Sequence, residues 1–278
     1  MRRYCRWEWT MRPIALAVML LALVFASGTA TAGQQSGFGF RFDAGLGWST
    51  MGETMYSDAR WSSGALVNVE EYWRLDFDGS GGPSMGAAFF VQFNRFVSLE
   101  FEGRGLFTSP DIRTDYDVYW DWNDGRSLWN AYRGYQYDSP TMRTMVGSIN
   151  LVTHLTDRGP ARPFLTAGFS AYDTAIRGAY DTAYAYTYTS GGQQYLEFDY
   201  PVMDFRADTS TIGFNVGVGA DMQLNRAMAL TFMVKYYHSE REEVNLRAVG
   251  GSYPELQGFV MEVDPSFWIT TGGIKFIF

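Results

Sequence analysis

Eight segments of this chain alternate apolar and polar side chains with a period of two, and this pattern constrains the fold more than any other feature. In residues 38–48, Phe38, Phe40 and Phe42 share one parity with further apolar residues, while glycines, Arg41 and Asp43 occupy the other. Successive side chains of a strand point to opposite faces, whereas a helix would mix the two sets. The pattern therefore predicts strands that each have one apolar and one polar face.

The alternation recurs along the rest of the chain, in residues 85–94, 97–104, 144–151, 165–172, 212–221, 228–237 and 268–278. Each segment is about as long as a tilted strand must be to cross a bilayer, roughly ten residues. The strand number is even, as expected for a barrel whose two termini lie on the same side of the membrane.

The connections between these segments alternate strictly between short and long. Three of them are tight, around residues 94–96, 156–160 and 223–226. The other four are long, over residues 49–83, 108–141, 173–208 and 238–264. Membrane barrels sort their loops in this way, with short periplasmic turns and long outer loops, while loops of this length are unusual in a compact soluble domain.

These patterns predict an all-β fold, an eight-stranded antiparallel up-and-down transmembrane β-barrel with four long extracellular loops. If hairpins in the loops inserted into the barrel, the strand number would rise to ten or twelve. Their acidic side chains would then approach lipid, and each would cost free energy on the order of kcal/mol. These acids include Glu70, Asp121, Glu197 and Asp199. Aromatic girdles are expected at both interfaces, formed by Trp48, Phe107, Tyr236 and Trp268 at the outer ends and by Phe38, Phe93, Phe96 and Phe278 at the periplasmic ends.

The first 32 residues have the features of a cleaved secretory signal peptide. Four arginines precede an apolar run over residues 14–26, and Ala30-Thr31-Ala32 matches a small-residue cleavage site. The apolar run is too short for a transmembrane helix of about 20 residues. We therefore expect a Sec-type signal peptide over residues 1–32 and a barrel domain over residues 33–278. Either Met1 or Met11 could be the initiating methionine.

Composition excludes several function classes for the expected mature chain. Without residues 1–32, 18 basic and 29 acidic residues leave a formal charge of −11, and the single cysteine, Cys5, is removed. An acidic chain of this kind is a poor nucleic-acid binder, and it has no disulfide or thiol metal site. Asp76 to Gly81 begins like a calcium loop, but the twelfth position, which needs a bidentate glutamate, is Ala87. No cofactor or metal is predicted.

The polar faces of the strands are expected to line the barrel interior. They carry four positive and four negative charges: Arg41, Asp43, Glu100, Glu102, Arg104, Asp221, Lys235 and Lys275. Eight strands leave an interior just wide enough for side chains to fill. Because buried ions are tolerable only when paired, a balanced set favours an internal ion-pair network over an open charged pore.

The signal peptide, eight alternating strands, sorted loops and terminal phenylalanine together resemble the small outer-membrane β-barrel proteins of the OmpA/OmpX type. The resemblance covers about residues 37–278 and is one of architecture. It implies an outer-membrane location among lipid and lipopolysaccharide. It also implies that the last strand, with Ile274, Phe276 and Phe278, is the signal read by the barrel-assembly machinery. The chain differs from OmpA in ending there, without a peptidoglycan-binding domain.

The outer loops are acidic and aromatic. Aromatic residues flank Asn123-Asp124-Gly125 and Ser190-Gly191-Gly192, which predicts hairpins that continue the sheet above the membrane. Such a surface suits a sugar, a protein or a cation, although the aromatics also serve to pack hairpins together. The expected function is a structural or surface-interaction role, through adhesion or ligand binding. A narrow porin-like channel is the alternative.

A lipid A-modifying hydrolase is the third hypothesis. His238, Glu240 and Ser266 share outward parity near the outer rim, where a serine, a histidine and a carboxylate are a possible catalytic set. The deacylase members of the family have histidine and serine two positions apart, whereas Ser239 here follows His238 directly. The other histidine, His154, is expected at the periplasmic end as a lumen or turn residue. We therefore predict no enzymatic activity.

Overall fold

The computed structural model describes residues 37–50, 53–61, 66–122, 127–134, 136–156, 159–181, 184–191, 193–199, 202–245, 247–248 and 260–278. The expected signal peptide lies outside the described residues. Within the part of the chain that is described, no helix is both long enough and apolar enough to cross a membrane.

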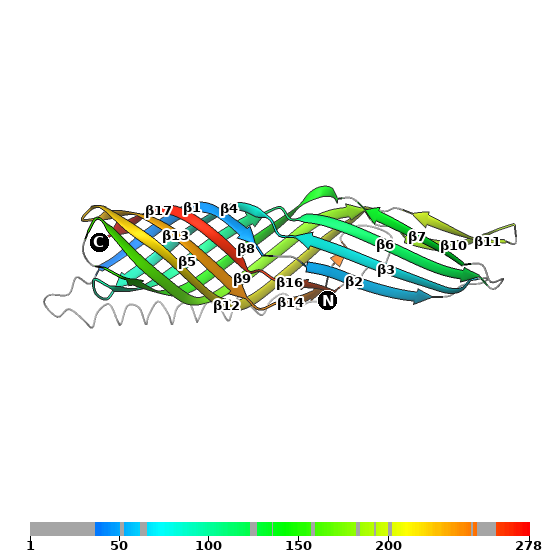
Figure 1. The fold of residues 1–278 in the computed structure, drawn as a ribbon, viewed down its shortest axis with the longest axis horizontal. Helices are drawn as coiled ribbons and strands as arrows, with labels where there is room; N and C mark the ends of the chain where they lie inside the picture. The colour runs from blue at the N-terminus through cyan, green and yellow to red at the C-terminus, as the bar shows by residue number, and fades with distance from the viewer. Residues whose placement is uncertain are drawn as a thin grey trace.

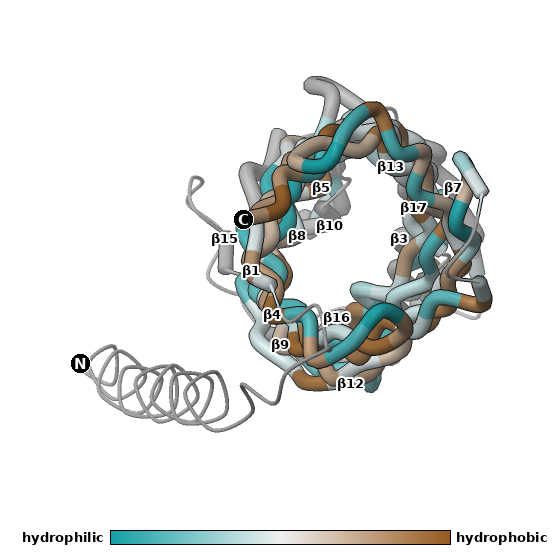
Figure 2. Tube along the Cα trace, turned by 90° about the vertical axis from the view of Figure 1, so that its left-hand side faces the viewer, coloured by the Kyte–Doolittle hydropathy of each residue, from teal (hydrophilic) through white to brown (hydrophobic). Residues whose placement is uncertain are grey.

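Eight long antiparallel strands close into a barrel. They are β1 (Gly37–Ser49), β4 (Gly81–Gln92), β5 (Val97–Thr108), β8 (Gln136–His154), β9 (Ala161–Asp181), β12 (Val202–Asn225), β13 (Met228–Ser239) and β17 (Phe267–Ile277). Each strand pairs with its neighbour in this series, and β17 pairs with both β1 and β13. Figure 2 shows the ring along its axis. The predicted eight-stranded antiparallel barrel is confirmed.

The register sets the tilt of the strands. Following paired residues from Arg41 through β4, β5, β8 and β9 reaches Gly213 of β12. The opposite route, through β17 and β13, reaches Gln223 of the same strand. These two residues are ten positions apart, so closure displaces the register by ten residues over eight strands. With ordinary strand rise and spacing, this shear tilts the strands by about 40° from the barrel axis.

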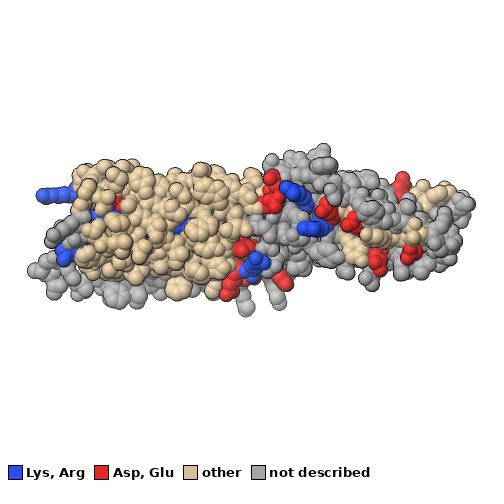
Figure 3. All heavy atoms as spheres, in the orientation of Figure 1, with Lys and Arg blue, Asp and Glu red and all other residues tan. Residues whose placement is uncertain are grey.

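An apolar band surrounds the barrel. The outward side chains are highly exposed even where they are large: Phe169 is 81% exposed and Ile212 67%. On β1 the band runs from Phe38 to Trp48, which at this tilt spans about 25 Å, the height expected of a membrane band. In the space-filling view, charged side chains are nearly absent from the barrel half and gather over the other half (Figure 3).

Aromatic rings mark both ends of this band. At the outer end Trp48 and Trp268 are cross-strand partners, and the Tyr236 and Trp268 rings lie 4.6 Å apart. At the periplasmic end the Phe38 and Phe278 rings stack at 5.7 Å. Amphipathic and aromatic rings at these levels anchor a barrel in the two interfaces.

The long loops form sheets beyond the barrel, and their hairpins do not insert between the barrel strands. They comprise β2 (Glu53–Trp61), β3 (Leu66–Asp78), β6 (Asp111–Trp122), β7 (Ser127–Gly134), β10 (Tyr184–Ser190), β11 (Gln193–Asp199), β14 (Glu242–Asn245), β15 (Arg247–Ala248) and β16 (Val260–Val263). The strands β2-β3-β6-β7 make one sheet, β10 pairs with β11, β14 pairs with β16, and β15 pairs with β12 near Arg206. Figure 1 shows these elements projecting from the end opposite the C-terminus.

Inward glycines make room for large lumen side chains. A Cβ added at Gly219 would overlap the Phe164 ring, and one added at Gly86 would lie 2.7 Å from an Arg104 guanidinium nitrogen. At each of these two positions the glycine therefore faces a large side chain of a neighbouring strand, which occupies the barrel interior at that level.

Candidate functional site

Glu102 of β5 is the centre of a buried ionic cluster in the lumen. Its carboxylate accepts hydrogen bonds from Lys235 Nζ at 2.6 Å, Arg104 Nε at 2.8 Å, Tyr237 Oη at 2.8 Å and Asn150 Nδ2 at 2.9 Å. The side chains of Glu102, Arg104 and Lys235 are fully shielded from solvent. Three strands, β5, β8 and β13, thus meet at one carboxylate, which ties opposite walls of the barrel together.

Arg41 and Asp43 of β1 extend this cluster. Arg41 donates to Asp43 at 2.9 Å and to Glu100 at 2.7 Å, and Asp43 also accepts from Arg104 at 2.5 Å. The cluster therefore holds three cations and three anions within the barrel interior. Because the charges balance and are hydrogen-bonded, their burial is tolerable in a low-dielectric interior.

A second, smaller cluster lies nearer the periplasmic end. Asp221 Oδ2 of β12 lies 2.8 Å from Lys275 Nζ and 3.0 Å from His154 Nε2. The structure thus places all eight expected lumen charges inside the barrel, in two groups. It adds His154, together with Asn150 and Tyr237, which sequence reasoning did not assign to the network. The sequence could have indicated these three residues, because their positions in the alternating pattern place them on the inward face, as Glu102 and Lys235 are.

Apolar side chains fill the lumen on both sides of the central cluster. Towards the outer end Tyr237 and Phe267 stack at 4.6 Å, beside the buried Leu106 and Ile269. Towards the periplasmic end Phe164 is buried against the His154 ring, with centroids 5.7 Å apart. Apolar side chains thus lie in the lumen on both sides of the central ion pairs.

The C-terminal residues face lipid and are held by β1. Ile274 and Phe278 are exposed on the outer surface, where Phe276 shares their parity. The Phe278 amide donates to the Phe38 carbonyl at 2.8 Å, and the Phe38 amide donates back at 3.3 Å. The last residue of the sequence is therefore part of the seam between the first and last barrel strands.

The three rim residues of the hydrolase hypothesis do not come together. His238 packs between the rings of Phe214 and Tyr236, at 4.8 and 6.2 Å. Ser266 is buried, and its Oγ accepts the Ser239 amide at 3.1 Å. The expected outward parity of Ser266 is wrong because β17 begins only at Phe267, so the alternation of a strand does not extend to it. Among the described residues no hydrogen bond joins Ser266, His238 and Glu240.

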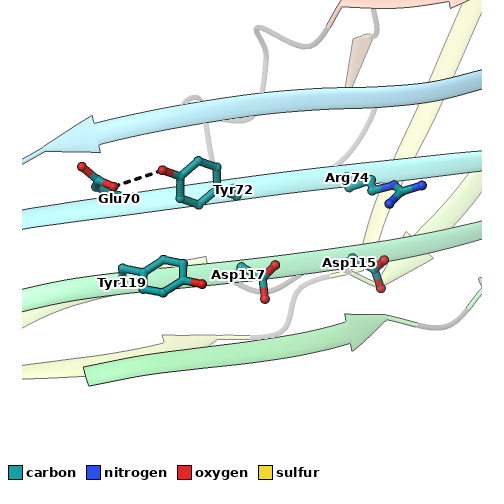
Figure 4. Close-up of a pocket in the computed structure, with 6 residues that line it drawn as sticks. All are labelled: Glu70, Tyr72, Arg74, Asp115, Asp117 and Tyr119. Atoms are coloured by element: carbon teal, nitrogen blue, oxygen red, sulfur yellow. Dashed lines mark hydrogen bonds between the residues drawn. The ribbon is translucent and has the colours of Figure 1, made fainter. Parts of the chain in front are cut away.

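A pocket lies on the projecting sheet, between β3 and β6. Its volume is about 550 Å³, and it is lined by Glu70, Tyr72, Arg74, Asp115, Asp117 and Tyr119. These are three successive cross-strand pairs on one face, as Figure 4 shows. Tyr72 Oη donates to Glu70 at 3.0 Å, and the Tyr72 and Tyr119 rings meet edge-on at 6.0 Å. The pocket thus offers three carboxylates, one guanidinium and two phenols.

The opposite face of β6 holds this pocket in place. Tyr116, Val118 and Trp120 have the other parity and are almost completely buried. A sheet with one buried aromatic face and one polar face keeps its register, because a slip of one residue would expose the buried set. The pocket residues are therefore carried by a packed sheet.

No group of histidine, cysteine and carboxylate residues suited to a metal occurs among the described residues. In the calcium-like segment, Asp78 lies 3.3 Å from the guanidinium of Arg113. An arginine at this distance disfavours a cation at the same carboxylate.

Comparison with known proteins finds likeness in structure alone. No protein-family model matches the chain, and no curated protein matches it. Among solved structures, OprG from Pseudomonas aeruginosa has 12% identity and a TM-score of 0.45, over 88% of this chain and 98% of OprG. Neisserial surface protein A has 12% identity and a TM-score of 0.40, over 86% and 97%.

A protease is also among the similar structures. OmpT from Escherichia coli has 12% identity and a TM-score of 0.40, over 90% of this chain and 99% of OmpT. At these identities the likeness concerns the fold, and the barrel assignment rests on the strand order and register of this chain. OprG is described as an outer membrane protein and OmpT as an outer membrane protease.

Proposed function

We propose that this protein is a closed membrane anchor that displays a surface-interaction sheet outside the cell, with the β3–β6 pocket as its ligand-binding site. The observation that carries the proposal is the contrast between the barrel and the sheet that projects beyond it. Within the band the lumen is filled by ion pairs and apolar layers, whereas beyond it the sheet carries an open polar pocket.

The chemistry of the pocket supports recognition of hydroxyl-rich or cationic groups. Carboxylates accept hydrogen bonds from sugar hydroxyls or ammonium groups, and tyrosine rings offer an apolar face beside a polar tip. The pocket charges, three carboxylates against one guanidinium, disfavour an anionic ligand.

The lumen and C-terminus have supporting roles in this proposal. The ion-pair network formed by the eight lumen charges acts as the polar core that holds the barrel closed. Ile274, Phe276 and Phe278 serve as the recognition segment for the barrel-assembly machinery. The hydrogen bonds between Phe278 and Phe38 support this role, since closing the barrel requires the last strand to reach the first.

The test combines conductance with ligand binding. The purified full chain, reconstituted in planar bilayers, should give no steady single-channel steps, and regular steps would favour the narrow-channel alternative. In parallel, the folded protein should be tested against immobilised oligosaccharides and cationic peptides. Asp117→Asn with Tyr119→Ser should abolish binding, whereas Asp111→Asn, an exposed change at the base of β6, should retain it. Equal binding by both variants would refute the pocket as the site.

A further inference from the structure

Three arginines gather on the outer surface just beyond the apolar band. On β8, β9 and β12 the register places Arg143, Ala175 and Asp208 in one row. The next row outward holds Arg177 directly opposite Arg206. All three guanidinium groups belong to residues exposed on the outer face of the barrel wall.

The charges in these two rows are incompletely matched. Arg206 binds Asp208 through two hydrogen bonds, of 2.6 and 3.2 Å. Among the described residues, no ion pair or side-chain hydrogen bond involves Arg143 or Arg177. Like charges directly opposite each other on neighbouring strands destabilise a sheet unless an anion lies between or beside them. Arg177 lies directly opposite Arg206, and the carboxylate in these two rows, Asp208, is bonded to Arg206.

The small side chain of Ala175 leaves space between Arg143 and Arg177. Arg143 is its cross-strand neighbour, and Arg177 is the next residue outward on the same face of β9. The acid at the inner side of this space, Asp173, accepts a hydrogen bond from Ser210 at 3.4 Å. An anionic group placed over Ala175 therefore meets Arg143 on one side and Arg177 at its outer side, while Asp208, on the other side, is bound by Arg206 through two hydrogen bonds.

This space lies at the level of the lipid headgroups. Two residues below Arg143 on β8 is Met145, which is 42% exposed within the apolar band, and the cross-strand partner of Arg143 on β5 is the outward ring of Phe107. The arginines thus begin where the apolar surface ends. Because the long loops project on this side, the adjoining leaflet is the outer one.

We propose that Arg143 and Arg177 bind a phosphate group of an outer-leaflet lipid over Ala175. Guanidinium groups bind phosphate through paired, charge-assisted hydrogen bonds, and basic residues beside an apolar membrane face recognise anionic lipid headgroups. The acyl chains of the same lipid would lie along the apolar band below, against Met145 and Phe107. The lipid would then contact β5, β8 and β9 together, at the base of the projecting sheet.

The experiment uses the full folded chain in neutral phosphatidylcholine nanodiscs that contain increasing amounts of diphosphoryl lipid A. Lipid retained by the protein is counted by native mass spectrometry after extraction into a neutral detergent. The wild type should retain lipid A, and Arg143→Gln with Arg177→Gln should weaken retention by at least tenfold. Arg226→Gln removes an exposed arginine from the periplasmic turn between β12 and β13 and should have no effect.

Two comparisons identify the source of the phosphate. Dephosphorylated lipid A should not be retained above background, and millimolar inorganic phosphate should not displace the lipid. Equal retention of the dephosphorylated lipid, or equal retention by the double variant, would overturn the proposal. Displacement by inorganic phosphate would also overturn it, since the site would then be one for soluble anions. A heat-dependent shift in gel mobility confirms that each variant is folded.

Discussion

Replacing Glu102 with glutamine tests whether the lumen charges hold the barrel together. The amide has nearly the shape of the carboxylate, so packing is retained and the charge alone is lost. The central cluster then holds three cations against two anions, Asp43 and Glu100. Lys235 loses a charge-assisted hydrogen bond of 2.6 Å, and Arg104 loses one of 2.8 Å. Neither side chain is exposed to solvent.

The expected cost follows from the burial of these groups. Removing one partner from a buried ion pair leaves an uncompensated charge and costs about 3–5 kcal/mol. We take about 4 kcal/mol, which lowers the equilibrium constant for folding about a thousandfold. A second substitution, Lys235→Met, removes the cation left without its partner. Glu102→Gln with Lys235→Met should therefore be more stable than Glu102→Gln alone.

The assay is equilibrium unfolding by urea of the barrel folded into thin lipid vesicles, followed by tryptophan fluorescence. Glu240→Gln is the matched control, because Glu240 is exposed at the outer end of β13 and should change stability by less than about 0.5 kcal/mol. A loss below about 1 kcal/mol for Glu102→Gln would show that the network does not stabilise the closed barrel. A double variant less stable than the single one would contradict the charge-balance reasoning.

Three further outcomes can be checked with simpler measurements. Gly219→Val should destabilise the barrel by about 1–3 kcal/mol, because its side chain would overlap the Phe164 ring; a melting temperature equal to that of the wild type would contradict this packing. Phe278→Ala should reduce the amount of assembled barrel in cells, measured as heat-shifted protein in outer-membrane fractions, while refolding of purified protein in detergent changes little. Expression of the protein should leave the lipid A mass spectrum unchanged, and any new species that His238→Ala abolishes would establish a hydrolase.

The barrel was predictable because lipid imposes one rule on every strand within the band. An outward residue must be apolar and an inward residue must pack the lumen, so parity along β1 or β12 is enough to assign both faces. The rule stops at the membrane surface. Beyond it, β8, β9 and β12 continue to lengths of 19, 21 and 24 residues, and both faces of a strand meet polar surroundings or other loops. Alternation then no longer marks where a strand ends.

The pocket on β3 and β6 was not predictable for a different reason. The two strands come from different loops, and their pairing places Tyr72 beside Asp117 across 45 positions of sequence. A hairpin can be recognised from the sequence of its turn. No such local sequence signal marks the pairing of strands from two different hairpins. The lumen shows the same limit, because parity places Glu102 and Lys235 inside the barrel while only the register brings them to 2.6 Å.

The paired length of β9 and β12 has a mechanical consequence. These strands stay hydrogen-bonded from Ala161 to Asp181, so a single ladder runs from the periplasmic end of the barrel into the projecting region. A pulling force on the outer sheet would load this ladder largely along the strands. Bonds loaded in shear share the force and must break together, whereas bonds at the end of a hairpin open one at a time. If a ligand held by the outer sheet were pulled by fluid flow, the force would therefore be distributed over the whole length of the barrel wall.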